Sequence, residues 1–67
     1  MFFKFYKSII NSNYVNYVDM DEITLNIYVY LTNHNRIEFK CKNLEALNKA
    51  FDLLLYRLNK SKEDTNG

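Results

Sequence analysis

Apolar and polar residues alternate with a period of two in the middle of the chain. Over residues 23–32, Ile, Leu and Val occupy every second position, with Thr, Asn and Tyr between them. This alternation predicts a β-strand with one face turned to a core. It returns over residues 36–42, after the polar residues 33–35. Two such strands joined by a short polar loop predict a β-hairpin.

The two apolar sets also predict how the hairpin strands pair. Both sets must face one core, because a one-residue slip would turn a whole strand over. A three-residue loop over 33–35 satisfies this condition, with Asn35 in the left-handed conformation that such a loop requires. The expected pairs are Leu31–Ile37, Val29–Phe39 and Ile27–Cys41 on the core face, and Tyr30–Glu38 and Tyr28–Lys40 on the outer face.

The residues before this hairpin are less regular. Residues 2–10 are rich in Phe, Tyr and Ile and end at an Asn-Ser-Asn turn cluster, which predicts a first strand. Its core face would carry Phe3, Phe5 and Ile9. Residues 14–22 leave alternatives open: the start fits a short strand, whereas the acidic end fits a helical turn or an irregular loop.

A helix is predicted over residues 44–60. Asn43 is a favourable N-cap, and Glu45 lies where the helix dipole favours a negative charge. The apolar stripe repeats with a spacing of three and four residues, through Leu44, Leu47, Phe51, Leu54 and Leu58. Residues 61–67 are polar and charged, and we expect them to form a disordered tail.

These elements predict a single α+β domain over residues 1–60. An antiparallel sheet of about three strands (2–10, 23–32 and 36–42) would carry the helix on one face. The expected core consists of Phe3, Phe5, Ile23, Leu25, Ile27, Val29, Leu31, Ile37, Phe39, Leu47, Phe51, Leu54 and Leu58.

The apolar arc of the helix is wider than one sheet face requires. At 100° per residue it covers about 200°, whereas a helix on a sheet needs somewhat over 100°. Ala46, Ala50 and Leu53 extend the arc on one flank, and Leu55 extends it on the other. Either residues 14–22 or a second chain must cover this surplus. Because a 67-residue chain also buries little surface alone, we expect a homodimer.

Composition excludes several kinds of chemistry. The chain has one Cys, one His, no Pro and a single terminal Gly, so it lacks an internal disulfide and a glycine-rich phosphate loop. His34 is interpreted as a turn residue and Cys41 as a core residue, too far apart for a dyad. The acidic residues at 19, 21 and 22 lack the glycine and distal Glu of a calcium loop. We therefore expect no catalytic, cofactor or metal site, and no enzyme.

Localisation follows from similar observations. The N-terminal residues do not resemble a signal peptide, and no apolar run approaches the roughly 20 residues that span a bilayer. A single unpaired Cys fits a reducing compartment. We expect a cytoplasmic protein with no membrane partner, in a bacterium or in the host of a phage. The excess of Asn, Lys, Tyr and Ile indicates a low-GC genome.

Tyrosines supply the candidate contact surface. Tyr6, Tyr28 and Tyr30 would lie opposite the core, near Glu38 and Lys40. Tyrosine is enriched where proteins bind proteins, so these five residues are the predicted protein-binding residues. The alternative is an outer face that merely carries strand-favouring residues.

Nucleic-acid binding is the second functional alternative. The lysines of the sheet could interleave with the tyrosines, as in proteins that stack single-stranded bases on aromatic rings. These lysines are Lys4, Lys7, Lys40 and Lys42. Glu38 within that face and a net charge of +1 weigh against this reading.

The order of elements resembles a broad class of small proteins. A strand, an Asn-Ser-Asn-Tyr-Val segment, a strong hairpin and a helix opening with Asn-Leu-Glu-Ala-Leu cover residues 2–60. In this the chain is similar to the accessory proteins of phages and mobile elements of low-GC Gram-positive bacteria. The resemblance implies an inhibitor or modulator that binds a larger host protein, such as a component of a CRISPR defence system.

Overall fold

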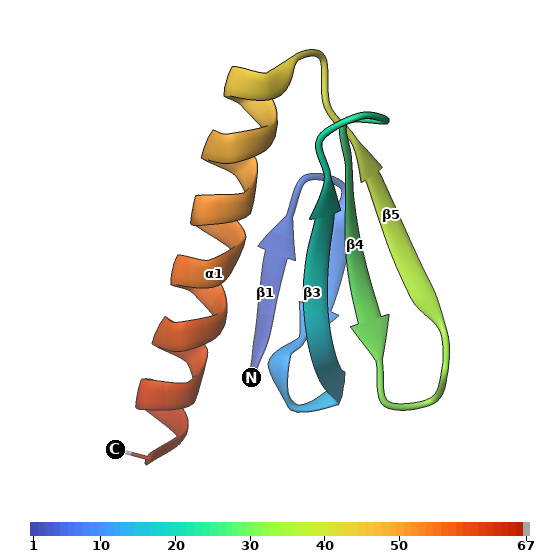
Figure 1. The fold of residues 1–67 in the computed structure, drawn as a ribbon. Helices are drawn as coiled ribbons and strands as arrows, with labels where there is room; N and C mark the ends of the chain where they lie inside the picture. Colours follow the sequence, from blue (N-terminus) through green and yellow to red (C-terminus); the bar gives the residue numbers. More distant parts are fainter. Residues whose placement is uncertain (67) are drawn as a thin grey trace.

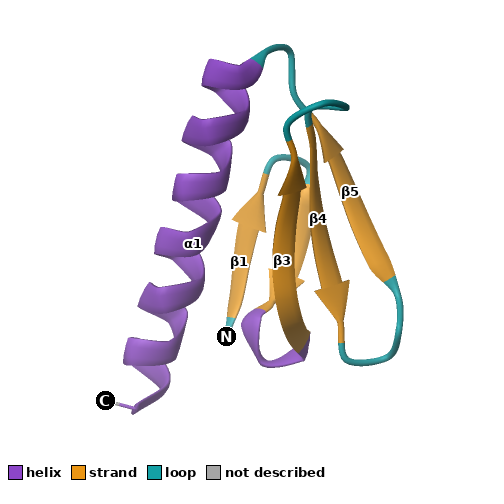
Figure 2. Ribbon diagram, in the orientation of Figure 1, coloured by secondary structure: helices purple, strands orange, loops and turns teal. Residues whose placement is uncertain are grey.

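The computed structural model describes residues 1–66, with side chains placed over 1–60. It shows an α+β fold with two antiparallel sheets and one C-terminal helix (Figures 1 and 2). Along the chain the elements are β1 (Phe2–Phe5), β2 (Ser8–Asn11), a 3-10 turn (Ser12–Tyr14), β3 (Val15–Asp21), β4 (Asn26–Leu31), β5 (Arg36–Lys40) and α1 (Leu44–Asn66).

The core lies on one face of the three-stranded sheet, whose order is β3-β4-β5. The inward side chains of this sheet, Ile27, Val29 and Phe39, join the buried residues of β1, β2 and α1 in one cluster. Helix α1 contacts β1, β4 and the 3-10 turn, and Figure 1 shows it running beside the sheets. The β1–β2 hairpin and α1 therefore cover the same face together.

Residues 2–10 form a hairpin rather than the single strand expected from the sequence. Strands β1 and β2 pair antiparallel through Phe3↔Ile10 and Phe5↔Ser8, around a two-residue turn that starts at Tyr6. The odd-numbered side chains of β1 face the core. After the two-residue turn, the even-numbered side chains of β2 face it instead. Ile10 is consequently buried, at 2% exposure, and the expected core residue Ile9 is 65% exposed.

Residues 14–22, which the sequence left open, form mainly the strand β3, whose pairing shifts register between Val15 and Tyr17. It pairs with β4, and its inward residues Val18 and Met20 pack against the core. The segment belongs to the sheet and does not fold over the helix. Strand β4 starts at Asn26, so the predicted strand 23–32 begins three residues too early.

The loop from β3 to β4 explains the late start of β4. The backbone N–H of Leu25 donates to the carbonyl of Asp21 over 2.8 Å, and Leu25 has a φ of 63°. Ile23 lies at the loop tip and is 93% exposed, so its assignment to the core was wrong. Leu25 still packs partly against the core.

The register of β4 and β5 is shifted by two residues from the expected one. The observed pairs are Ile27↔Phe39, Tyr28↔Glu38, Val29↔Ile37 and Tyr30↔Arg36. A two-residue shift keeps every side chain on its predicted face, which is why the hydrophobic pattern could not distinguish the two registers. The loop still has three residues, but they are 32–34, and His34 takes the left-handed φ of 72° expected of Asn35.

Helix α1 begins as predicted and is longer. The Asn43 side chain accepts from the N–H of Ala46 over 2.8 Å, which confirms the N-cap. Glu45 pairs with Lys49 one turn later, at 3.3 Å. The helix extends to Asn66, six residues past the predicted end. The expected disordered tail over 61–67 falls on residues whose side chains lie outside the described part.

The wide apolar arc of the helix is partly covered by the chain itself. Ala50 is 4% exposed and belongs to the core, so its assignment to a self-association surface was wrong. Ala46 is half-buried and packs against the core. Leu53 and Leu55 stay exposed, at 47% and 38%.

Candidate functional site

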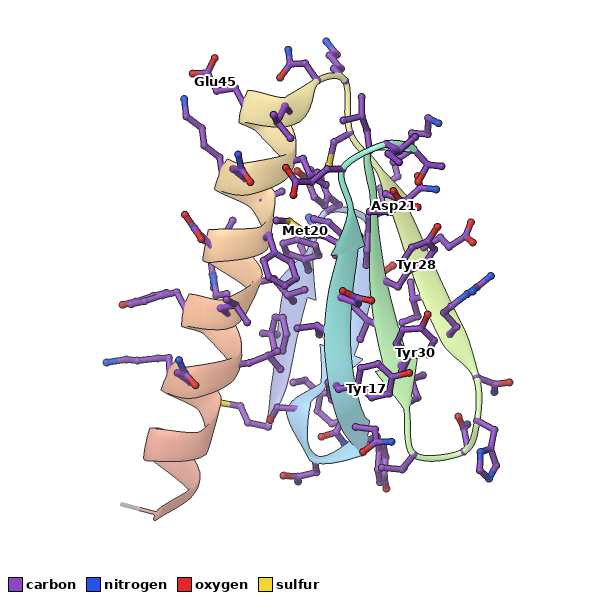
Figure 3. All side chains as sticks on the ribbon, in the orientation of Figure 1. Tyr17, Met20, Asp21, Tyr28, Tyr30 and Glu45 are labelled. Carbon is purple, nitrogen blue, oxygen red and sulfur yellow. The ribbon has the colours of Figure 1, made fainter. Side chains whose placement is uncertain are left out.

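The outward side of the three-stranded sheet carries a set of tyrosines. Tyr17 of β3 lies opposite Tyr30 of β4, which lies opposite Arg36 of β5. In the next row, Tyr28 lies between Asp19 and Glu38. We call these six residues the tyrosine face. Figure 3 shows Tyr17, Tyr28 and Tyr30 on the side of the sheet turned away from α1.

The aromatic rings of the tyrosine face pack against one another. Tyr17 and Tyr30 stack with ring centroids 4.4 Å apart and planes at 16°, and Tyr28 and Tyr30 lie at 6.3 Å. The Arg36 guanidinium carbon lies 4.9 Å above the Tyr28 ring, within cation–π range. The Asn26 side chain donates to the Tyr28 hydroxyl over 3.2 Å. The rings are thus held in place by contacts within the chain.

Charges surround these rings. Arg36 donates to the Glu38 carboxylate over 3.0 Å. The pKa of Arg36 is raised above its ordinary value, chiefly by the Tyr30 side chain and further by the charge of Glu38. Asp19 lies opposite Tyr28 on β3, and its carboxylate accepts from the backbone N–H of Met20 over 2.9 Å. The face therefore presents aromatic area within a border of mixed charge.

A cleft lies between the β1–β2 turn and strand β5. It has a volume of about 360 Å³ and is lined by Tyr6, Lys7, Ser8, Glu38, Phe39 and Lys40. We call it the turn cleft. The Tyr6 ring lies 5.9 Å from that of Phe39, and partial burial, with a smaller contribution from Cys41, raises the pKa of the Tyr6 hydroxyl. Tyr6 itself has a φ of 54°, which is rare for a bulky residue.

A second cavity lies at the other end of β5. It has a volume of about 240 Å³, and we call it the apolar groove; its lining residues are Phe2, Ile9, Ile10, Asn11, Tyr14, Leu31 and Ile37. Phe2, Ile9 and Tyr14 are all exposed. The turn cleft and the apolar groove thus both lie between the β1–β2 hairpin and the β4–β5 hairpin.

The structure divides the predicted contact residues between two places. Tyr28, Tyr30 and Glu38 lie together on the tyrosine face, as the alternation predicted. Tyr6 is in a turn and lines the turn cleft with Glu38 and Lys40. The expectation that Tyr6 shares a sheet face with Tyr28 and Tyr30 was wrong, because residues 2–10 are a separate hairpin.

Sequence reasoning missed three members of the tyrosine face, namely Tyr17, Asp19 and Arg36. Tyr17 lay in the segment whose structure was left open, so its stacking on Tyr30 could not be predicted. Arg36 was placed two residues away from Tyr30 by the incorrect register. The alternation of Val18 and Met20 with Tyr17 and Asp19 was the available signal for a strand here.

The candidates for other chemistry do not come together. His34 lies in the β4–β5 loop, whereas the buried thiol of Cys41 lies just beyond the opposite end of β5. Within the described residues, no three His, Cys, Asp or Glu side chains gather closely enough to hold a metal ion. Lys4 lies in the smaller sheet and Lys40 in the larger one, and the Lys40 ammonium donates to the Thr24 carbonyl over 3.1 Å.

No protein-family model, curated protein or solved structure matches the chain. Over the residues that the structure describes, no helix combines the length and apolar character needed to cross a bilayer.

Proposed function

We propose that the chain is a non-catalytic protein-binding module that docks on a larger protein through the tyrosine face. The observation that carries the proposal is the ordered packing of Tyr17, Tyr30, Tyr28 and Arg36 on a sheet face turned away from the helix. Tyr and Arg are the residue types that most often dominate binding energy at protein interfaces. Their rigid packing also lowers the conformational entropy that binding must remove.

The charges around the rings favour a protein over a nucleic acid. Asp19 and Glu38 flank Tyr28, so a phosphate backbone laid across these rings would meet two carboxylates. Arg36 is paired with Glu38, and the lysines do not gather in one patch, because Lys4 is in β1 and Lys40 is in β5. A partner surface with basic and apolar groups complements this arrangement.

The kind of target is proposed from the resemblance to phage and mobile-element accessory proteins. On that basis the target is a larger host protein in the cytoplasm, such as a defence-system component, and docking inhibits or modulates it. A small rigid domain without its own chemistry acts by covering a surface that the target needs.

Affinity capture with matched tyrosine variants tests the proposed function. The bait proteins are the wild type, a Tyr17→Ser/Tyr30→Thr double variant, and a Tyr56→Ser control. Tyr56 is an exposed tyrosine on α1, away from the tyrosine face. A low-GC bacterial lysate is the source, and each captured protein is then purified and titrated against the three baits.

We expect one captured protein to bind the wild type and the control alike. Its affinity for the double variant should fall at least about tenfold, as for interface residues that contribute over 1 kcal/mol. Thr keeps the strand propensity of position 30, and circular dichroism checks the fold. An equal loss of affinity in the double variant and in the Tyr56→Ser control would refute the proposal. Salt-sensitive oligonucleotide binding without protein capture would favour the nucleic-acid alternative.

A further inference from the structure

Strand β5 has one edge without a partner. The N–H of Leu31 donates to the Asn35 carbonyl, and the N–H of Cys41 donates to the Leu25 carbonyl, both over 2.8 Å. Along a strand of an antiparallel ladder, every second residue bonds through its backbone to a given neighbour. The backbone groups at the odd positions of β5 therefore face β4. The backbone groups of Arg36, Glu38 and Lys40 therefore point away from β4. Among the described residues these groups have no backbone partner.

The other edge of the sheet is less accessible. Leu55 and Leu58 of α1 line a cavity of about 180 Å³ together with Val15 and Val18 of β3. The N–H of Met20 on β3 donates to its neighbour Asp19. In Figure 1, β5 is the strand of this sheet farthest from α1. An incoming strand therefore has its best access at β5.

Both large cavities lie along this open edge. Phe39 lines the turn cleft and Ile37 lines the apolar groove, and both side chains point to the inner side of the sheet. A strand added to β5 would place alternate side chains on that inner side. Two apolar side chains of such a strand would enter the two cavities.

The outward side chains of β5 set the charge of the complementary strand. Arg36, Glu38 and Lys40 alternate in sign and are exposed. Cross-strand pairs of opposite charge are favourable, and like charges opposite each other are not. The matching sequence is acidic, basic and acidic at alternate positions, with apolar residues between them.

We infer that the free edge of β5 accepts an amphipathic β-strand of the partner protein, which carries acidic, basic and acidic residues on one side and apolar residues on the other. This inference rests on the proposed function and names the element of the partner that docks. Pairing of main-chain groups supplies affinity, and the charges and cavities supply specificity.

A second copy of β5 cannot pair all three charges of this edge. A symmetric antiparallel pairing centred on Glu38 opposes two Glu38 carboxylates and sets Arg36 against Lys40. A pairing centred on Ile37 joins Arg36 to Glu38 but leaves Lys40 without an acidic partner. The charges of the edge thus favour a different sequence.

Synthetic peptides test the inference directly. The probe is the acetylated, amidated peptide Thr-Glu-Val-Lys-Val-Glu-Thr. Antiparallel pairing sets its central Lys opposite Glu38, with the backbone N–H and carbonyl of that Lys facing β5. One control peptide has Lys and Glu exchanged, and another has the amide of its central Lys methylated so that it cannot donate. Binding is followed by NMR, which also reports hydrogen exchange of each backbone amide.

We expect the probe to bind at least about tenfold more tightly than either control peptide. Hydrogen exchange of the Arg36, Glu38 and Lys40 amides should slow at least tenfold on binding. A charge-reversed protein, with Arg36→Glu, Glu38→Lys and Lys40→Glu, should prefer the charge-exchanged peptide instead. A Lys49→Glu variant on the exposed side of α1 should behave as the wild type.

Two results would overturn the inference. One is binding of the methylated peptide as tightly as the probe, and the other is no slowing of exchange at the three amides. If the peptide fails but a captured protein still depends on Tyr17 and Tyr30, the proposed function stands and only the strand-docking inference is lost. If the peptide binds and no protein is captured, the proposed function is lost, and β5 keeps only the ability to accept an added strand.

Discussion

Asparagine and aspartate side chains shape most of the turns of this protein. The chain has no Pro, and its single Gly is the last residue. Asn11, Asp21, Asn33 and Asn43 instead each accept a hydrogen bond from a backbone N–H two or three residues ahead. These short polar side chains mimic backbone turns and cap helices. The abundance of Asn, which we took as a sign of a low-GC genome, thus has a structural role at three positions.

Asp21 makes the stability of the β3–β4 loop dependent on pH. Its carboxylate accepts from the N–H groups of Ile23 and Thr24, at 2.9 and 3.3 Å, and these bonds lower its pKa below the ordinary value of 3.8. The charged form is favoured in the folded state. Its contribution to stability is therefore present above about pH 4 and is lost as the pH falls through the lowered pKa.

We expect Asp21→Ala to unfold at a lower urea concentration than the wild type at pH 7, with a smaller difference near pH 2.5. The Asp21→Asn variant keeps an acceptor oxygen and should lie between the two at pH 7. Asp52→Ala, on the exposed surface of α1, is the control and should leave the midpoint nearly unchanged. A difference between Asp21→Ala and the wild type that is equal at both pH values would contradict this assignment.

Left-handed residues explain why turns were the least predictable part of the sequence. Tyr6, Leu25 and His34 all have positive φ, and of these only His is a residue type enriched in that conformation. Tyr6 and Leu25 fell within predicted strands, which hid the hairpin turn in residues 2–10 and the late start of β4. Such positions cost about 1–3 kcal/mol each and persist only where the surrounding packing over-determines them.

Elements with a long, strict period were predicted well, and short ones were not. The stripe of α1 was correct from Leu47 to Leu58, although Leu44 is 46% exposed, and the faces of β4 and β5 were correct because their alternation runs over five or more residues. The β1–β2 hairpin was missed because a four-residue strand has only two side chains on each face. That is too few to show that the core-facing positions change from odd to even. The Tyr17–Tyr30 stack depended on β3 and on its pairing with β4, neither of which local pattern specifies.

Two adjacent isoleucines test the hairpin assignment. Ile10→Ala should lower the free energy of unfolding by about 2–4 kcal/mol, because Ile10 is fully buried. Ile9→Ala should change it by no more than about 0.5 kcal/mol, as for an exposed site. Urea denaturation of the two variants measures both values. A larger loss from Ile9→Ala would instead support one continuous strand with Ile9 on its core face.

At the scale of the whole molecule, the apolar arc of α1 is covered by the chain itself more fully than the sequence suggested. The β1–β2 hairpin joins α1 on the inner face of the larger sheet, so Ala46 and Ala50 are covered without a second chain. Only Leu53 and Leu55 remain of the helix surplus, and two positions apart on a helix they point about 200° away from each other. One flat interface cannot bury both of these residues.

Self-association through the helix surplus, which stays a prediction, must therefore use one flank of α1. Leu55 borders the cavity that α1 forms with β3, so its flank already has neighbours within the chain. Leu53 lies on the flank of the half-buried Ala46 and is the residue left for a second copy.

We expect the wild type to sediment as a dimer at high concentration and Leu53→Lys to sediment as a monomer. Leu55→Lys, the matched control on the other flank, should stay dimeric. A monomer of 8.1 kDa at every concentration of the wild type would rule out the dimer, and the exposed leucines would then be ordinary surface residues.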